Sequence, residues 1–186
     1  MYLIILISAV WFVSELILAL TRRSHRNVAR KSDRSSLRLL WLTIVVCIIA
    51  GVFAGIRGIG YIPAAVPWLN YAGIVIILVG LTIRWLAILT LRRFFTIDVA
   101  IAREHEIIQK GLYAHIRHPS YTGSLLSFFG LGLAFANWLS TLIITAPILA
   151  AFLYRIKIEE AVMLDAFGEK YLAYCKHTSR LIPRIY

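Results

Sequence analysis

Cysteine and charge are both scarce in this sequence. The two cysteines, Cys47 and Cys175, form neither a disulfide framework nor a zinc-binding pattern, so we expect inert side chains and working parts in a reducing compartment. Charged residues make up 16% of the 186 positions, whereas soluble domains carry about 25%. Hydrophobic residues make up 60%. This composition excludes a water-soluble globular fold and predicts a single membrane domain.

Five apolar runs are typical of membrane-spanning helices, which need about 20 such residues. They cover residues 2–20, 39–56, 68–91, 121–136 and 139–154. The first run has no basic residues before it, which favours an anchor over a cleaved signal peptide. The last two are short and share a turn at Asn137-Trp138, so they predict a hairpin, and Pro147 predicts a kink in the fifth. We therefore expect an all-α integral membrane protein with five transmembrane helices.

Acidic residues are also scarce, with 9 Asp+Glu against 20 Lys+Arg, and the basic residues are unevenly distributed. Seven lie in residues 21–38, five in 92–119 and six in 155–186, whereas the loop between the second and third runs has only Arg57. Because cytoplasmic loops are enriched in Lys and Arg, the N-terminus is predicted outside and the C-terminus in the cytoplasm. No aromatic residues interleave the charges of 21–38, so we expect that loop to contact anionic membrane lipids and not nucleic acid.

Two ionisable residues, Glu15 and Arg84, lie inside the expected spans. Both are roughly 8–11 Å from the cytoplasmic end of their helices, at 1.5 Å per residue. Charges at that depth are paired, extend to the interface or face a polar cavity. The pattern is therefore compatible with a structural ion pair, with snorkelling or with a role in a site.

The loop 92–119 leads into the sequence RHPSYTG at residues 117–123. Its alternating residues 95–101 predict a strand and residues 109–111 a turn, so we expect a cap over the cytoplasmic face. Pro119 suits a helix start, where free N–H groups attract anions, and Arg117 and His118 add polar groups there. The site would suit a carboxylate or phosphate; a capped helix with snorkelling side chains is the alternative. His115 and His118 are three apart, but Pro119 lets a helix only begin here, so we expect no metal.

A second polar cluster, Arg155, Glu159 and Glu160, follows the fifth run. Arg155 and Glu159 are one helical turn apart and can share a face. The residues after them, 161–174, have amphipathic helical spacing, which predicts a C-terminal helix along the membrane or over the bundle. Because the hairpin returns the chain to the face that carries His118, the two clusters are predicted to converge on one site.

Several segments between residues 90 and 184 resemble the integral-membrane methyltransferase superfamily of isoprenylcysteine carboxyl methyltransferases and phospholipid methyltransferases. The segments, in order, are Gly111-Leu112-Tyr113, RHPSYTG, Glu159-Glu160, FGEKY at 167–171 and Arg180-Leu181-Ile182-Pro183. The resemblance implies S-adenosylmethionine at the cytoplasmic face and a lipid substrate that enters from the bilayer. It also implies a division into residues 1–91, with three transmembrane helices, and a cofactor-binding and catalytic region at 92–186.

The resemblance further implies residue roles. Arg155 would orient a substrate carboxylate, and Glu159 would support the same wall of the catalytic site. The implied cofactor-binding residues are Tyr113, His118, Tyr121, Gly123, Glu160 and Pro183.

The leading hypothesis is carboxyl O-methylation of an isoprenylcysteine-like or other lipid-linked carboxylate. Three alternatives stay open: a phospholipid or small-amine N-methyltransferase, an NADPH-dependent membrane reductase with a similar C-terminal pattern, and a non-enzymatic membrane scaffold.

Overall fold

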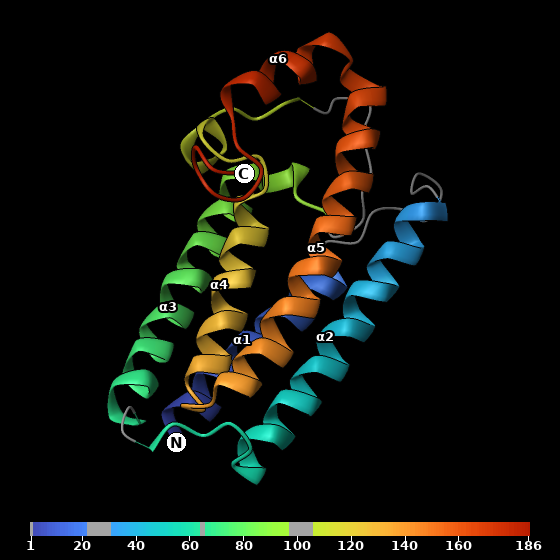
Figure 1. Cartoon of the computed structure of the whole chain (residues 1–186). Coiled ribbons are helices and arrows are strands. Elements are labelled where there is room, and N and C mark those ends of the chain that lie inside the picture. The colour runs from blue at the N-terminus through green and yellow to red at the C-terminus, as the bar shows by residue number, and fades with distance from the viewer. Residues whose placement is uncertain (1, 22–30, 64–65, 97–105) are drawn as a thin grey trace.

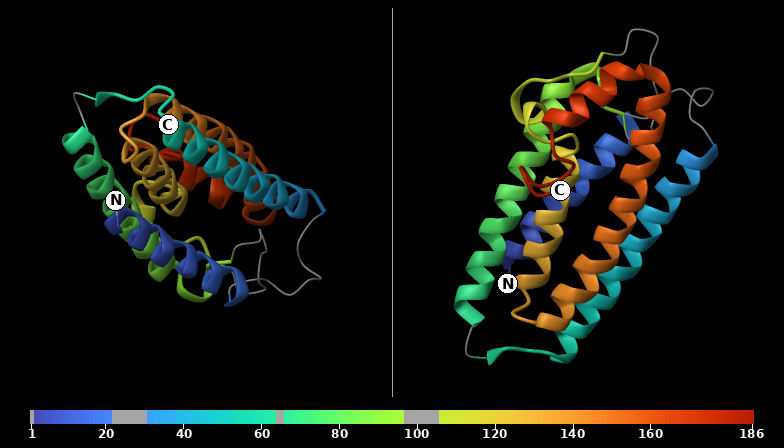
Figure 2. Two further views of the ribbon diagram at one scale, coloured as in Figure 1. Left: turned by 90° about the horizontal axis from the view of Figure 1, so that it is seen from below. Right: turned by 45° about the horizontal axis from the view of Figure 1, so that its top comes forward.

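The apolar runs fold as long helices that lie side by side and alternate in direction (Figure 1). The computed structural model describes residues 2–21, 31–63, 66–96 and 106–186. The long helices are α1 (Tyr2–Thr21), α2 (Lys31–Arg57), α3 (Val66–Leu91), α4 (Pro119–Leu133) and α5 (Trp138–Phe167). The short helices η2 (Arg92–Phe94), η3 (Gly111–Ala114) and α6 (Glu169–His177) lie at the end of the bundle opposite the start of α1 (Figures 1 and 2). The expectation of an all-helical fold is confirmed for the described residues, which contain no named strand.

Four of the helices are long and apolar enough to cross a membrane. Their candidate spans are Leu3–Thr21, Ser35–Arg57, Pro67–Leu91 and Trp138–Phe167. The fifth, α4, has 15 residues and is therefore about 22 Å long, short of a hydrocarbon core of about 30 Å. The structure supports four of the five expected spans, and a crossing by α4 stays a prediction.

Paired glycines allow α3 and α4 to pack with their backbones in contact. A Cβ atom on Gly123 would lie 2.5 Å from the carbonyl oxygen of Gly80, and one on Gly73 would lie 2.6 Å from that of Gly130. No larger residue fits at these distances, so the spacing of seven residues on both helices determines their register. This contact fixes the first turn of α4, which carries His118 and Tyr121, relative to α3.

The fifth helix is longer than its apolar run. We expected a span ending at residue 154 and a separate amphipathic helix over 161–174, and those bounds are wrong. The helix continues through Pro147 and ends at Phe167, because the segment after residue 154 contains no glycine or proline before Gly168. Gly168, with φ of +51°, ends α5, and α6 then folds back over the bundle with Tyr171 and Tyr174 buried.

Some expectations fall on parts of the chain outside the described residues. The expected strand at 95–101 lies there except for its first two residues, of which Phe95 is buried in an extended conformation. Half of the basic loop 21–38, residues 22–30, also lies there, whereas residues 31–38 belong to α2 and not to a loop. The turn expected at 109–111 leads directly into η3, where Gly111 has φ of +60°.

Candidate functional site

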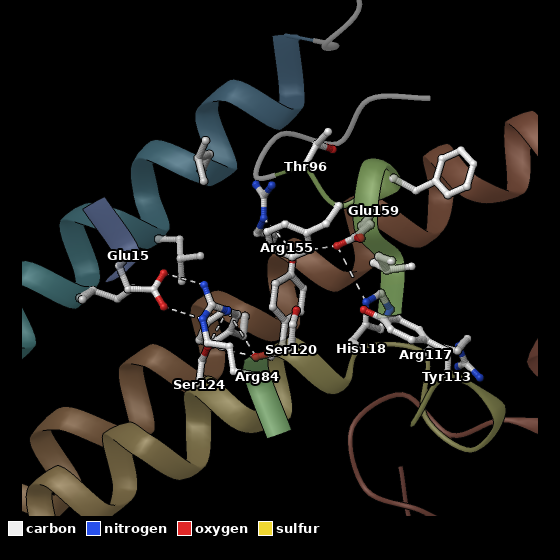
Figure 3. Close-up of a pocket in the computed structure, with 18 of the residues that line it drawn as sticks. Glu15, Arg84, Thr96, Tyr113, Arg117, His118, Ser120, Ser124, Arg155 and Glu159 are labelled. Atoms are coloured by element: carbon white, nitrogen blue, oxygen red, sulfur yellow. Dashed lines mark hydrogen bonds and ion pairs between the residues drawn. The ribbon is translucent and has the colours of Figure 1, made fainter. Parts of the chain in front are cut away.

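A cavity of about 390 Å³ lies inside the capped end of the bundle (Figure 3). All five long helices contribute side chains to its wall, together with η3 and α6. One part of the wall is apolar and includes Trp11, Leu40, Ile44, Phe128, Leu131 and Phe152. Another part is polar and includes Arg117, His118, Tyr121, Arg155 and Glu159. The cavity can therefore accept a molecule with a long apolar part and a polar end.

Arg155 is the most deeply buried cation among the described residues, with an exposed fraction of 1%. Its Nε donates to the Tyr121 hydroxyl at 3.1 Å, and its Nη1 donates to Oγ of Ser36 at 3.1 Å. The Tyr121 hydroxyl in turn donates to Oε2 of Glu159 at 2.7 Å. This chain of hydrogen bonds joins α2, α4 and α5 around the guanidinium, and Tyr121 links Arg155 to the glutamate one turn away.

His118 occupies the N-cap position of α4, and each of its ring nitrogens faces a glutamate. Its ring is buried and stacks on that of Tyr121, with centroids 5.6 Å apart and planes 4° from parallel. Nδ1 lies 3.8 Å from Oε2 of Glu159, and Nε2 lies 3.6 Å from Oε1 of Glu160. Nε2 forms no hydrogen bond. The His118 ring is therefore held between two carboxylates, and its Nε2 lies just beyond hydrogen-bond distance of Glu160.

Arg117 lines the cavity and also contacts the C-terminal segment, so its expected role at an anion site stays a prediction. Its Nε donates to Oε1 of Glu160 at 2.8 Å, and its Nη1 donates to the carbonyl oxygens of Thr178 and Cys175. Oε2 of Glu160 accepts from Nε of Arg180 at 2.9 Å. Glu160 thus lies between two arginines behind His118, and Arg117 is engaged in holding the C-terminal segment.

The C-terminal segment is hydrogen-bonded to the residues at the start of α4. The backbone N–H groups of Arg117 and His118 donate to the carbonyl oxygens of Ser179 and Arg180 at 2.8 and 3.0 Å. The hydroxyl of Thr122 donates to the carbonyl oxygen of Leu181 at 2.7 Å. These bonds give the segment before α4 backbone partners from more than 50 residues away and hold it against the C-terminal segment.

Three tyrosines from the cap complete the wall. The hydroxyl of Tyr174 donates to the carbonyl oxygen of Tyr113 at 2.7 Å, which fastens α6 to η3. Burial raises the pKa of Tyr113, of Tyr171 and of Tyr174 above the ordinary value. All three phenols therefore stay neutral near pH 7, and all three side chains line the cavity.

The structure brings five of the eight predicted site residues to the cavity and leaves three outside its lining. Those that line it are Tyr113, His118, Tyr121, Arg155 and Glu159. Glu160 lies behind His118, Gly123 faces α3, and Pro183 lies in an exposed turn. The roles that the resemblance implies for these three stay predictions. Sequence reasoning missed Ser36, a small polar residue within the expected basic loop 21–38, for which no pattern gives a signal.

Glu15 and Arg84 form the ion pair that was one of the expected possibilities. Nε and Nη2 of Arg84 donate to Oε1 and Oε2 of Glu15 at 2.5 and 2.6 Å, in a bidentate arrangement. Nη1 donates to Oγ of Ser124 at 2.8 Å, and the indole N–H of Trp11 donates to Glu15 at 3.2 Å. The pair fastens α1 to α3 and α4 within the cavity wall (Figure 3).

No group of three His, Cys, Asp or Glu side chains is placed to hold a metal ion within the described residues. His115 is exposed, whereas His118 is buried at the cavity, so the two do not present a common ligand face.

Comparison with known proteins decides the family. The model of the isoprenylcysteine carboxyl methyltransferase family matches residues 73–165, half of the chain. The chain belongs to this family. The matched range includes His118, Tyr121, Arg155 and Glu159, which line the polar wall of the cavity.

Related proteins and one solved structure agree with membership of the isoprenylcysteine carboxyl methyltransferase family. A probable protein-S-isoprenylcysteine O-methyltransferase of Oryza sativa subsp. indica is 34% identical over 120 residues, 63% of each chain. Protein-S-isoprenylcysteine O-methyltransferase A of Arabidopsis thaliana is 29% identical over 183 residues, 96% of this chain and 90% of its own. The eukaryotic intramembrane Ras methyltransferase ICMT superposes with a TM-score of 0.65 at 28% identity, over 76% of this chain and 52% of that chain.

The chain thus spans less than two thirds of the rice relative and about half of the solved structure. The resemblance seen in the sequence is confirmed. Together with the four long apolar helices, it identifies a multi-pass membrane protein of a methyltransferase family.

Proposed function

We propose that this protein is an S-adenosylmethionine-dependent membrane methyltransferase that esterifies the carboxylate of an isoprenylcysteine-like or other lipid-linked acid. The observation that carries the proposal is one cavity with an apolar wall and a buried arginine. The apolar part, between α1, α2 and α4, suits a prenyl or acyl chain. Arg155 suits the carboxylate at the end of that chain, because a guanidinium binds a carboxylate with two parallel hydrogen bonds.

The residues around His118 fit the methyl donor. S-adenosylmethionine would supply a methyl group on a positively charged sulfonium, which is already activated for transfer. His118 lines the cavity, and its ring stacks on that of Tyr121, so it would form one side of the donor pocket. The aromatic rings of Tyr113 and Tyr121 and the carboxylate of Glu159 favour its positive charge. Glu160 would act indirectly, by keeping Arg117 and the segment before α4 in place.

The work left to the protein is alignment of the two reactants. A carboxylic acid with a pKa of about 4 is ionised near pH 7, so the acceptor needs no general base. Arg155 would hold the acceptor oxygen toward the donor site, and the Tyr121–Glu159 hydrogen bond would hold Arg155. Aligned reactants can lower a barrier by roughly 7–11 kcal/mol, which is the contribution that such a site can make.

The proposal includes an orientation in the membrane. Five crossings, with α4 as the short fourth, would put the N-terminus outside and the C-terminus in the cytoplasm, as the basic residues indicate. The cap of η3, α6 and the C-terminal segment would then lie at the cytoplasmic face, where a soluble donor is available. Residues 1–91 would form three crossings and one side of the lipid cavity, and 92–186 the cofactor-binding and catalytic region.

Ligand-dependent stability tests the cofactor class. We expect S-adenosylhomocysteine to raise the unfolding temperature of the detergent-solubilised protein, and NADPH to leave it unchanged. Stabilisation by NADPH alone would favour the membrane reductase instead. A protein that no cofactor stabilises, and that tolerates His118→Ala, would be a scaffold.

The methylated product distinguishes the two transferase classes. A carboxyl methyl ester releases its methyl group in mild base, whereas an N-methylated amine does not. An amine acceptor must also lose a proton before it reacts, and Glu159 is the carboxylate of the polar wall that could accept it. Glu15 suits that role less well, because both of its oxygens accept hydrogen bonds from Arg84.

A further inference from the structure

Ser36 is a buried polar residue on α2. It belongs to none of the sequence motifs and has no role in the proposed reaction. Its exposed fraction is 1%, whereas Ser35, one position earlier, is exposed. Oγ of Ser36 accepts a hydrogen bond of 3.1 Å from Nη1 of Arg155, which is 119 positions away on α5. The first part of α2 therefore reaches the guanidinium that would bind the acceptor.

The guanidinium of Arg155 is held at two different nitrogens by two different helices. Tyr121 on α4 accepts from Nε, and Ser36 on α2 accepts from Nη1. A planar group that has one anchor can still turn about it, whereas a second anchor fixes its plane as well. Because bidentate recognition of a carboxylate depends on that plane, the second anchor determines whether both donor atoms reach the carboxylate.

We propose that Ser36 is a positioning residue, which orients the Arg155 guanidinium so that the site selects acceptors with a free carboxylate. The inference rests on the proposed function, since it assigns Arg155 to the acceptor. It gives α2 a part in selecting the polar end of the acceptor, in addition to its apolar residues that line the same cavity.

Selection between two forms of one acceptor tests the inference. The probes are an N-acylated, S-prenylated cysteine with a free carboxylate and its carboxamide, and binding is measured by titration without methyl donor. We expect the unmodified protein to prefer the carboxylate and Ser36→Ala to lower that preference about tenfold, which is the effect of one hydrogen bond to a charged group. The affinity for S-adenosylhomocysteine should not change, and KM for the carboxylate should rise more than kcat falls.

Three further variants separate positioning from general damage to the fold. Ser35→Ala is the matched control and should keep the full preference. Ser36→Thr retains the hydroxyl and should restore it. In an Arg155→Ala background, Ser36→Ala should cause no additional loss, because the serine acts through the arginine.

The contradicting outcomes are equally specific. The inference is overturned if Ser36→Ala keeps the preference for the carboxylate, or if it lowers the affinity for both probes equally. It is also overturned if Ser36→Ala lowers the preference further in the Arg155→Ala background. If Ser36→Ala does not fold, the comparison is made between Ser36→Thr and Ser36→Cys, and equal preference in those two variants overturns it. If the unmodified protein methylates the acid and Ser36→Ala leaves its preference for the carboxylate unchanged, the inference alone is refuted. If the unmodified protein neither methylates the acid nor prefers it to the carboxamide, the proposed function is refuted as well.

Discussion

The hydroxyl of Tyr121 donates a hydrogen bond of 2.7 Å to Glu159 and so links the first turn of α4 to the C-terminal half of α5. The same oxygen accepts from Nε of Arg155 at 3.1 Å, so one phenol connects the two charged residues of the polar wall. The ring of Tyr121 also stacks on His118 and packs against Phe152. Tyr121 is therefore the residue at which the proposed donor and acceptor parts of the cavity meet.

Removal of the Tyr121 hydroxyl should disconnect that network. Tyr121→Phe keeps the ring but leaves Arg155 and Glu159 each without one charge-assisted hydrogen bond, so we expect kcat/KM for methyl transfer to fall at least tenfold. Steady-state kinetics with the prenylated acid measures it. Tyr154→Phe, an exposed tyrosine on the same helix as Arg155, is the control and should keep full activity. Equal activity of both variants would contradict the role of the network.

His118 should contribute to donor binding more than to folding. His118→Ala removes no hydrogen bond at Nε2 but does remove a buried ring that stacks on Tyr121, so the unfolding temperature without ligand is measured beside the donor affinity. We expect the affinity for S-adenosylhomocysteine to fall about tenfold in calorimetric titration. The exposed His115→Ala is the matched control. An unaltered affinity in His118→Ala would remove this residue from the donor site.

The Glu15–Arg84 pair makes a prediction about stability. Arg84→Met alone leaves a buried carboxylate without its cation, so it should lower the free energy of unfolding by about 3–5 kcal/mol. The double variant Glu15→Leu/Arg84→Met removes both charges and should recover most of that loss. Denaturant unfolding in detergent measures both. Independent, additive losses would show that the two residues do not act as a pair.

Much of the fold could be predicted because hydrophobic length is a local property. The runs ending at Leu20, Ile56 and Leu91 match α1, α2 and α3 within about two residues at that end. The end of α5 was wrong because hydropathy falls at Arg155 while helix-forming residues continue to Gly168, and helices extend beyond the membrane as long as nothing breaks them.

The site could be predicted only for residues that lie within a recognisable sequence pattern. The convergence of His118 and Glu159 followed from the hairpin, and the structure places them 3.8 Å apart. The backbone partners of Arg117 were missed because carbonyl oxygens some 60 positions away belong to no side-chain pattern. Ser36 was missed for a similar reason, since only its buried hydrogen bond with Arg155 marks it as part of the site.

The chemical identity of the methylated product tests the central claim most directly. The solubilised protein is incubated with S-adenosylmethionine carrying a labelled methyl group and an N-acylated, S-prenylated cysteine, and the lipid-soluble product is treated with mild base. We predict labelled methanol from the unmodified protein and from Lys157→Ala, an exposed cation on α5, and at least a hundredfold less from Arg155→Ala, which still binds S-adenosylhomocysteine. Label that stays with the lipid after base, or an ester yield that Arg155→Ala does not change, would contradict a carboxyl methyltransferase whose arginine binds the acceptor.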